Sequence, residues 1–204
     1  MTVRVMLISP APGTALRTAR FDDGSGLDAR GLDAARSAAG TLPLSGHVLV
    51  SPSLRCRQTA QALGLTASGE APVGWAMGAW RGRTLDEVAA EQPDAVAAWL
   101  ADPAAAPPGG ESLAGLCERA AGWLDALAGG GGRVVAVVEP ELVRAAVVHA
   151  LGSPATAFWR LDVPPLTATE LSGRLGRWNV RLGAGLGPVP DGGGADADGG
   201  AGPG

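Results

Sequence analysis

Short runs of β-branched and aliphatic residues alternate along the chain with longer stretches in which apolar residues recur at helical spacing. The clearest runs are Val3 to Ile8, His47 to Val50 and Val134 to Val138, and each is typical of a buried strand. Helical patterns occupy residues 27–39, 53–63, 112–127 and 142–151. Strands that alternate with helices predict an α/β fold, a three-layer α/β/α sandwich with a largely parallel sheet and Val3 to Ile8 at its centre.

Breaks in the pattern set further boundaries. Residues 84–100 are helical in composition but contain Pro93, which has no amide hydrogen to continue a helix, so two short helices are expected there. Ser112 can cap the next helix, which we expect to end at the four glycines 129–132. Residues 158–171 and 177–182 are interpreted as late strands.

Length and composition indicate one domain followed by a tail. The 204 residues suffice for one substantial core, and residues 1–182 are predicted to form it. From 183 to 204 the chain consists mostly of glycine, proline, alanine and aspartate, with too little apolar surface to offset the entropy of ordering. This tail is predicted to be disordered.

Charge and cysteine content exclude several classes of function. The net charge is −4 and lysine is absent, whereas a nucleic-acid-binding surface needs clustered basic side chains, so no nucleic-acid partner is expected. Cys56 and Cys117 are far apart and lack metal-ligand spacing; we expect neither a metal nor another cofactor. The N-terminal apolar run stops at Ile8, too short for a signal peptide or a membrane span, which predicts a cytoplasmic protein without a membrane partner.

Three polar strings follow one another at characteristic distances: Ser51 to Ala60 (SPSLRCRQTA), Met77 to Thr84 (MGAWRGRT) and Gly109 to Ser112 (GGES). Together with the first strand and its loop, they resemble the histidine phosphatase superfamily, which includes the phosphoglycerate mutases and the α-ribazole phosphatases. The Ser-Pro-x-x-Arg-x-x-Gln-Thr-Ala string is the most specific part. The resemblance covers nearly the whole chain before the tail and implies a phosphoglycerate mutase-like fold.

The chemistry of that family does not transfer to this chain residue by residue. In the family a histidine after the first strand attacks phosphorus, while two arginines and a second histidine hold the phosphate oxygens. Here the attacking histidine corresponds to Pro10 and the arginine before it to Ser9. The second histidine corresponds to Glu139, whose charge repels phosphate, and the proton donor falls at or near Gly74. Only Arg55, at the second arginine position, is retained.

The leading hypothesis is therefore a pseudoenzyme that has lost phosphoryl transfer and binds a small molecule or a protein. The predicted ligand-binding residues are Arg55, Ser9, Glu139 and Trp75. Arg55 has two equal interpretations, an anion-binding group or the partner of Glu139 in an ion pair that fills the old phosphate pocket. Trp75 could line the pocket with apolar surface, which would suit a neutral or aromatic ligand better than a phosphate ester.

Two alternatives remain open. The chain could be an active phosphomonoesterase or a phosphoglycerate mutase-like enzyme with a rearranged site. That site would use Arg55 together with a nucleophile that the sequence does not identify. Ser9 is a weak candidate, because its only nearby base would be Glu139, and a serine that bonds its own loop is favoured. A nucleotide-binding loop over Pro10 to Thr14 is also weak, since two prolines remove backbone donors. The sequence leaves a homodimer open.

Several remaining residues have structural interpretations. The two histidines, His47 and His149, lie away from the positions that the family mechanism needs. Glu111 is expected to support the first turn of the helix that follows it, and orienting pocket groups is its second interpretation. Cys56 is expected to pack inward, although the charge of Arg55 could instead lower its pKa. Tryptophans are expected in the core at five positions: Trp80, Trp99, Trp123, Trp159 and Trp178.

Overall fold

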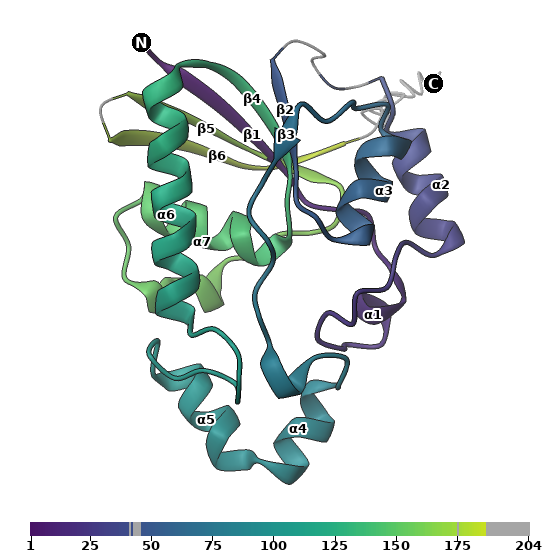
Figure 1. Ribbon diagram of the computed structural model, residues 1–204, viewed down its shortest axis with the longest axis vertical. Helices are drawn as coiled ribbons and strands as arrows, with labels where there is room; N and C mark the ends of the chain where they lie inside the picture. Colours follow the sequence, from purple (N-terminus) through teal and green to yellow (C-terminus); the bar gives the residue numbers. More distant parts are fainter. Residues whose placement is uncertain (41, 43–45, 175, 187–204) are drawn as a thin grey trace, which may run out of the picture.

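The computed structural model describes residues 1–40, 42, 46–174 and 176–186. Its middle layer is one six-stranded sheet with the order β3-β2-β4-β1-β5-β6 (Figure 1). The strands are β1 (Val3–Ile8), β2 (His47–Val50), β3 (Gly69–Glu70), β4 (Gly132–Val137), β5 (Thr167–Arg174) and β6 (Arg177–Gly185). The helices are α1 (Thr14–Arg17), α2 (Ala29–Ser37), α3 (Leu54–Ala62), α4 (Leu85–Glu91), α5 (Pro93–Ala101), α6 (Leu113–Gly130) and α7 (Pro140–Ala150).

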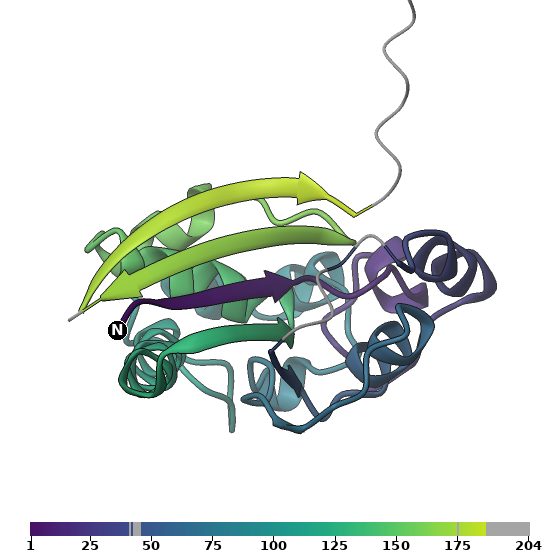
Figure 2. The ribbon, with the colours of Figure 1, turned by 90° about the horizontal axis from the view of Figure 1, so that it is seen from above.

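The sheet is mixed, with a larger parallel part. β3, β2, β4 and β1 run parallel to their neighbours, whereas β5 and β6 pair antiparallel at the other side of β1. Figure 2 shows the resulting twisted sheet, with β6 along one edge. The predicted α/β class and the central place of β1 are confirmed. Because the parallel strands end on the same side of the sheet, the loops after β1, β2 and β4 meet there.

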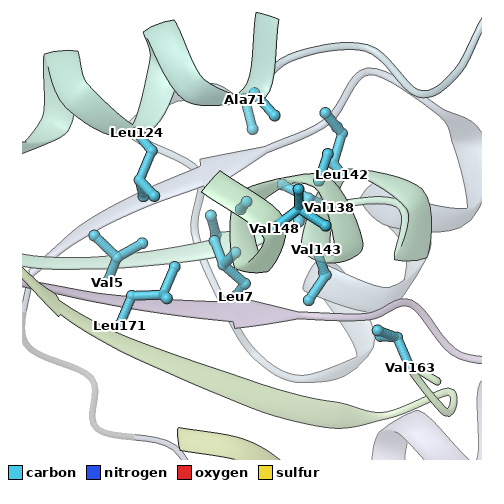
Figure 3. Packing of buried hydrophobic residues seen from close by; sticks show 14 of the residues in the cluster. Val5, Leu7, Ala71, Leu124, Val138, Leu142, Val143, Val148, Val163 and Leu171 are labelled. Atoms are coloured by element: carbon cyan, nitrogen blue, oxygen red, sulfur yellow. The ribbon is translucent and has the colours of Figure 1, made fainter. Parts of the chain in front are cut away.

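Alternation along the central strands explains the three layers. Val5 and Leu7 of β1 face a core shared with α6 and α7, while Ile8 faces the core beneath α2 and α3. Successive residues of a strand point to opposite faces, so a strand covered on both faces reads as a continuous apolar run. Figure 3 shows the first of these cores, where Leu124 of α6 and Leu142 of α7 lie against the sheet.

Two sequence predictions were wrong near the C-terminal strands. Residues 158–171 do not form one strand: a 3-10 helix spans Ala155–Arg160, and β5 begins only at Thr167. Pro164 and Pro165 separate the two, because a residue without an amide hydrogen cannot donate to a strand ladder. The tail boundary at 183 was also early, since β6 continues to Gly185. Residues 187–204 of the predicted tail lie outside the described residues.

The interpretation of Pro93 as a helix break is confirmed. α4 ends at Glu91 and α5 starts at Pro93 itself. A capping box begins α4, in which Glu87 N donates to Thr84 Oγ1 at 3.1 Å and Thr84 N donates to Glu87 Oε2 at 2.8 Å. Figure 1 shows α4 and α5 as an extension below the sheet. A third cluster of buried residues, with Trp80 and Trp99, packs this extension.

Asp28 joins α1 to α2. It caps α2 by accepting from Gly31 N at 2.7 Å, and it pairs with Arg17 through two contacts, at 2.5 and 3.1 Å. The Arg17 hydrogen bond, aided by the Gly31 amide, lowers the pKa of Asp28 to about 2. A carboxyl whose pKa is depressed on folding stabilises the protein above its unfolded pKa, and this contribution is lost as pH falls toward 2.

Asp28→Ala is therefore expected to lower the urea midpoint of unfolding at neutral pH. The difference from wild type should shrink as pH falls below about 4, the unfolded pKa of aspartate, because protonation removes the same interaction from the natural protein. Asp33→Ala is the matched control, since Asp33 lies on the same helix and only reaches Arg36 at 3.6 Å across the surface. An equal midpoint shift for both variants would contradict the assignment.

In the part of the chain that the structure describes, no helix combines the length and the apolar character needed to cross a membrane.

Candidate functional site

The candidate site lies where the carboxyl ends of β1, β2 and β4 meet. The register pairs Ile8 and Val50 with Val137 from either side, so the residues that follow these strands come together. Ser9 follows β1, and Glu139 lies between β4 and α7 as the N-cap residue of that helix. The crevice outside the carboxyl ends of parallel strands is the usual binding position in α/β proteins.

Arg55 and Glu139 form an ion pair in the centre of this site. Arg55 lies in the first turn of α3, which Ser53 caps by accepting from Cys56 N at 3.2 Å. The side chains of Arg55 and Glu139 are 13% and 2% exposed. Burial acts to lower the pKa of Arg55, but the Glu139 carboxylate outweighs it and raises the pKa above its ordinary value. The ion-pair interpretation of Arg55 is thus confirmed, and its role in ligand binding stays a prediction.

The attraction between opposite charges holds this pair together. Among the described residues, three buried atoms of the pair have no hydrogen-bond partner: Arg55 Nε and both carboxylate oxygens of Glu139. The two charged groups are nevertheless in close contact. A buried charge without such partners is costly unless the opposite charge stays beside it. Each member of the pair therefore depends on the other.

Ser9 is held by hydrogen bonds to Pro164 and Thr167. Ser9 is fully buried. Its Oγ donates to the carbonyl oxygen of Pro164 and accepts from Thr167 N at 3.2 Å. The expectation that Ser9 bonds its own loop was wrong, because Pro164 precedes β5 and Thr167 is the first residue of that strand. After Pro10, Ala11 N donates to Thr59 Oγ1 at 3.0 Å, so the Gln-Thr-Ala string secures the loop that follows β1.

The space beside Gly74 is occupied by a carboxyl group that the sequence analysis missed. A side chain at Gly74 would place its first carbon 3.0 Å from Glu139 Cγ and 3.0 Å from Glu141 Oε1. Glu141 Oε1 also accepts from Trp75 N at 3.2 Å. Burial raises the pKa of Glu141, and the Glu139 carboxylate raises it further. The pattern Glu-Pro-Glu at 139–141, at the start of α7, was the available signal.

Two neighbouring cavities open beside the ion pair. The larger has a volume of about 540 Å³ and is lined by Ser53, Gly74 and Glu139 among others. The smaller, of about 250 Å³, is lined by Arg55 and by residues of α5 and α7. Both cavities share Asp22, Trp75, Met77 and Glu141. Trp75 therefore lies beside the ion pair, in the place that the sequence suggested.

A family model described as histidine phosphatase superfamily (branch 1) matches residues 14–184. The chain belongs to the histidine phosphatase superfamily. The matched residues begin after β1 and the loop that contains Ser9 and Pro10, so membership rests on the rest of the domain. None of the curated protein sequences compared with this chain matches it.

Several solved phosphatase structures have the same fold as this chain. A mycobacterial glucosyl-3-phosphoglycerate phosphatase is 22% identical, with a TM-score of 0.77, 91% of this chain covered and 100% of that chain. A putative α-ribazole-5'-P phosphatase from Escherichia coli is 19% identical, with a TM-score of 0.79 and coverages of 91% and 97%. A phosphoserine phosphatase mutant from Entamoeba histolytica is 17% identical, with a TM-score of 0.76 and coverages of 89% and 96%. At these identities the likeness establishes the fold alone.

In this superfamily member the Gly-Gly-Glu-Ser string at 109–112 contacts the segment that lines the site. Glu111 binds Arg119 through two contacts of 2.9 and 2.7 Å, and Arg119 donates to the carbonyl oxygens of Val73 and Gly74. Trp75 Nε1 donates to the Glu111 carbonyl oxygen at 2.9 Å. Ser112 caps α6 as predicted, and Glu111 pairs with Arg119 of the same helix while it holds the segment that carries Trp75. Support of the first helical turn by Glu111 stays a prediction.

The remaining candidate groups lie outside the site's chemistry. Cys56 is buried, and burial raises its pKa well above the ordinary value, so the interpretation of a thiol with a lowered pKa was wrong. His149 contacts Asp125 at 3.0 Å, and His47 is exposed at the start of β2. Over residues 1–40, 42, 46–174 and 176–186, no group of three or more His, Cys, Asp and Glu side chains could hold a metal ion.

Proposed function

We propose that this superfamily member does not transfer phosphoryl groups and instead binds a small ligand in the remodelled pocket. The observation that carries the proposal is the buried Arg55–Glu139 ion pair. Arg55 is the one retained phosphate-binding residue of the resemblance, and its charge is already neutralised from within the protein. A phosphate ester would have to displace a carboxylate that belongs to the chain.

The charges around the pair add to this argument. The carboxyl group of Asp22 also acts on Arg55 and raises its pKa, and Asp22 lines both neighbouring cavities. Two like charges about 4 Å apart near a protein surface repel by about 4 kcal/mol. A dianionic phosphate would therefore meet repulsion where the family mechanism needs attraction.

None of the side chains of Ser9, Pro10, His47 and His149 is in place to attack phosphorus. Pro10 has no nucleophilic side-chain atom and no amide hydrogen to donate. Ser9 Oγ is engaged with Pro164 and Thr167. His47 lies at the opposite end of β2 from the site, and His149 is bound to Asp125. These positions support binding rather than turnover.

A phosphatase assay tests the proposal. The natural sequence, Arg55→Ala and Arg57→Ala are incubated at high concentration with p-nitrophenyl phosphate from acidic to neutral pH. We expect no turnover above buffer in any of them, and no added phosphate mass after exposure to a phosphodonor. Arg57 is exposed on the same helix, so it controls for surface effects.

One outcome would establish the alternative, an active phosphomonoesterase or phosphoglycerate mutase-like enzyme. That outcome is turnover that Arg55→Ala abolishes and Arg57→Ala retains, with circular dichroism showing that both variants are folded. A covalent phosphoenzyme found by mass spectrometry would lead to the same conclusion and would identify the nucleophile.

A further inference from the structure

The smaller cavity beside the ion pair is walled by aromatic rings from separate parts of the chain. Its lining includes Phe21, Trp75, Trp99, Phe158 and Trp159. Ring centroids are 4.7 Å apart for Trp99 and Trp159, 5.3 Å for Trp75 and Trp99, and 5.1 Å for Phe158 and Trp159. Such walls favour a flat ring, because aromatic faces and edges attract one another when they are offset or perpendicular.

Two hydrogen-bond donors in this wall have no acceptor. Trp99 is 5% exposed, and its Nε1 has no hydrogen-bond partner among the described residues; the same holds for Arg144 Nε. By contrast, Trp75 Nε1 and Trp80 Nε1 both donate to oxygen atoms, at 2.9 and 3.1 Å. A buried donor left unsatisfied costs about 1–3 kcal/mol. An acceptor on a ligand would remove this cost.

Charge indicates that the acceptor is an anion. Arg20, Arg55 and Arg144 all line the cavity. Arg55 is neutralised by Glu139, and Arg20 lies 3.6 Å from Glu87. Among the residues that the structure describes, Arg144 has an ion-pair contact with Asp162 alone, at 3.9 Å, and the Asp162 side chain is 88% exposed. A surface contact of this kind contributes little, so the Arg144 guanidinium is the cation most able to bind an incoming anion.

The opposing carboxyl groups weaken this attraction without cancelling it. Asp22 and Glu141 also line the cavity. Burial raises the pKa of Glu141, which favours its uncharged form and lowers its repulsion toward an anion. Arg144 is held beside the aromatic wall, since its guanidinium carbon lies 5.6 Å from the centre of the Phe158 ring.

We propose that this cavity binds a small planar aromatic carboxylate. The ring lies against Trp75, Trp99 and Trp159, and the carboxylate accepts from Arg144 and from Trp99 Nε1. The volume of about 250 Å³ suits a single-ring compound, at the small end of ligand sites. This inference rests on the proposed binding function and adds the chemical class of the ligand.

Calorimetric titration with benzoate tests the ligand class. Benzyl alcohol has the ring without the charge, and cyclohexanecarboxylate has the charge without the aromatic ring. We expect saturable binding of benzoate and at least about tenfold weaker binding of each analogue, because each lacks one of the two recognised features. Quenching of tryptophan fluorescence should follow the same order.

Variants of the two donors locate the site. Arg144→Met is expected to weaken benzoate binding by at least about tenfold, since a charge-assisted hydrogen bond is lost. Trp99→Phe keeps a ring but removes the donor, so a smaller loss of a few-fold is expected. Arg160→Met is the matched control, because Arg160 is exposed and outside the cavity lining, and it should bind benzoate as the natural protein does. Thermal melts check that all three variants are folded.

The inference is overturned if benzoate binds no better than benzyl alcohol, or if Arg144→Met and Trp99→Phe bind it unchanged. Its failure is separate from failure of the proposed function. Arg55-dependent phosphatase turnover overturns the proposed function, whatever the ligand. Absence of turnover together with absence of Arg144-dependent benzoate binding overturns only the ligand class.

Discussion

Replacing Glu139 by leucine is expected to lower the free energy of unfolding by about 3–5 kcal/mol, because it leaves the buried Arg55 guanidinium without its counter-charge. Arg55→Met should cost a similar amount, since it leaves the Glu139 carboxylate buried alone. The double variant Arg55→Met/Glu139→Leu should lie close to the natural protein or above it, as well-packed apolar groups commonly replace a buried ion pair without loss.

Urea unfolding of the four proteins in this cycle measures the coupling directly. The two single variants should also differ in their response to acid. A lone carboxylate can be buried after it takes up a proton, so the loss in Arg55→Met should shrink as pH falls. Arginine keeps its charge throughout, so the loss in Glu139→Leu should not shrink. Arg57→Met, on the exposed side of α3, controls for loss of a surface arginine. A cost below about 1 kcal/mol for Glu139→Leu, the range of a surface pair, would contradict the buried pair.

Trp80→Ala is expected to cost about 3–5 kcal/mol, the range of large aromatic deletions in a core. Trp80 is 1% exposed. Its ring stacks on Phe21, with ring centroids 5.9 Å apart, and meets Trp99 edge-on, with ring centroids 5.5 Å apart. Its Nε1 also donates to Gln92 Oε1 at 3.1 Å, between α4 and α5. Removing the ring should therefore loosen the extension that carries Trp99, so benzoate binding should weaken together with stability.

Thermal and urea unfolding measure this cost, and Trp123→Ala is the comparison. Trp123 is half-buried on α6 and does not line either cavity beside the ion pair. Its loss should be smaller and should leave benzoate binding unchanged. Equal losses of stability and of binding in the two variants would show that Trp80 has no special place in the packing of α4 and α5.

Much of the fold followed from local patterns. β1, β2 and β4 were predicted because strands covered on both faces are mostly apolar. The break at Pro93 was predicted because proline cannot continue a helix. The strand predicted from 158 was wrong because a short apolar run has no period that separates a strand from a 3-10 helix. Phe158 is buried in the first core, Trp159 packs against that core, and both also line a cavity, which local sequence does not reveal.

For the site, the sequence by itself determined which residues are present, Arg55, Pro10, Gly74 and Glu139 among them. Those identities are chemical facts that no packing alters. That the last three stand in place of the family's reactive groups is a prediction from the resemblance. Only the tertiary structure decided that Glu139 neutralises Arg55, and that Glu141 of α7 fills the space beside Gly74. The physical reason is that charge pairing and filling of space act between groups that the fold brings together from distant parts of the chain.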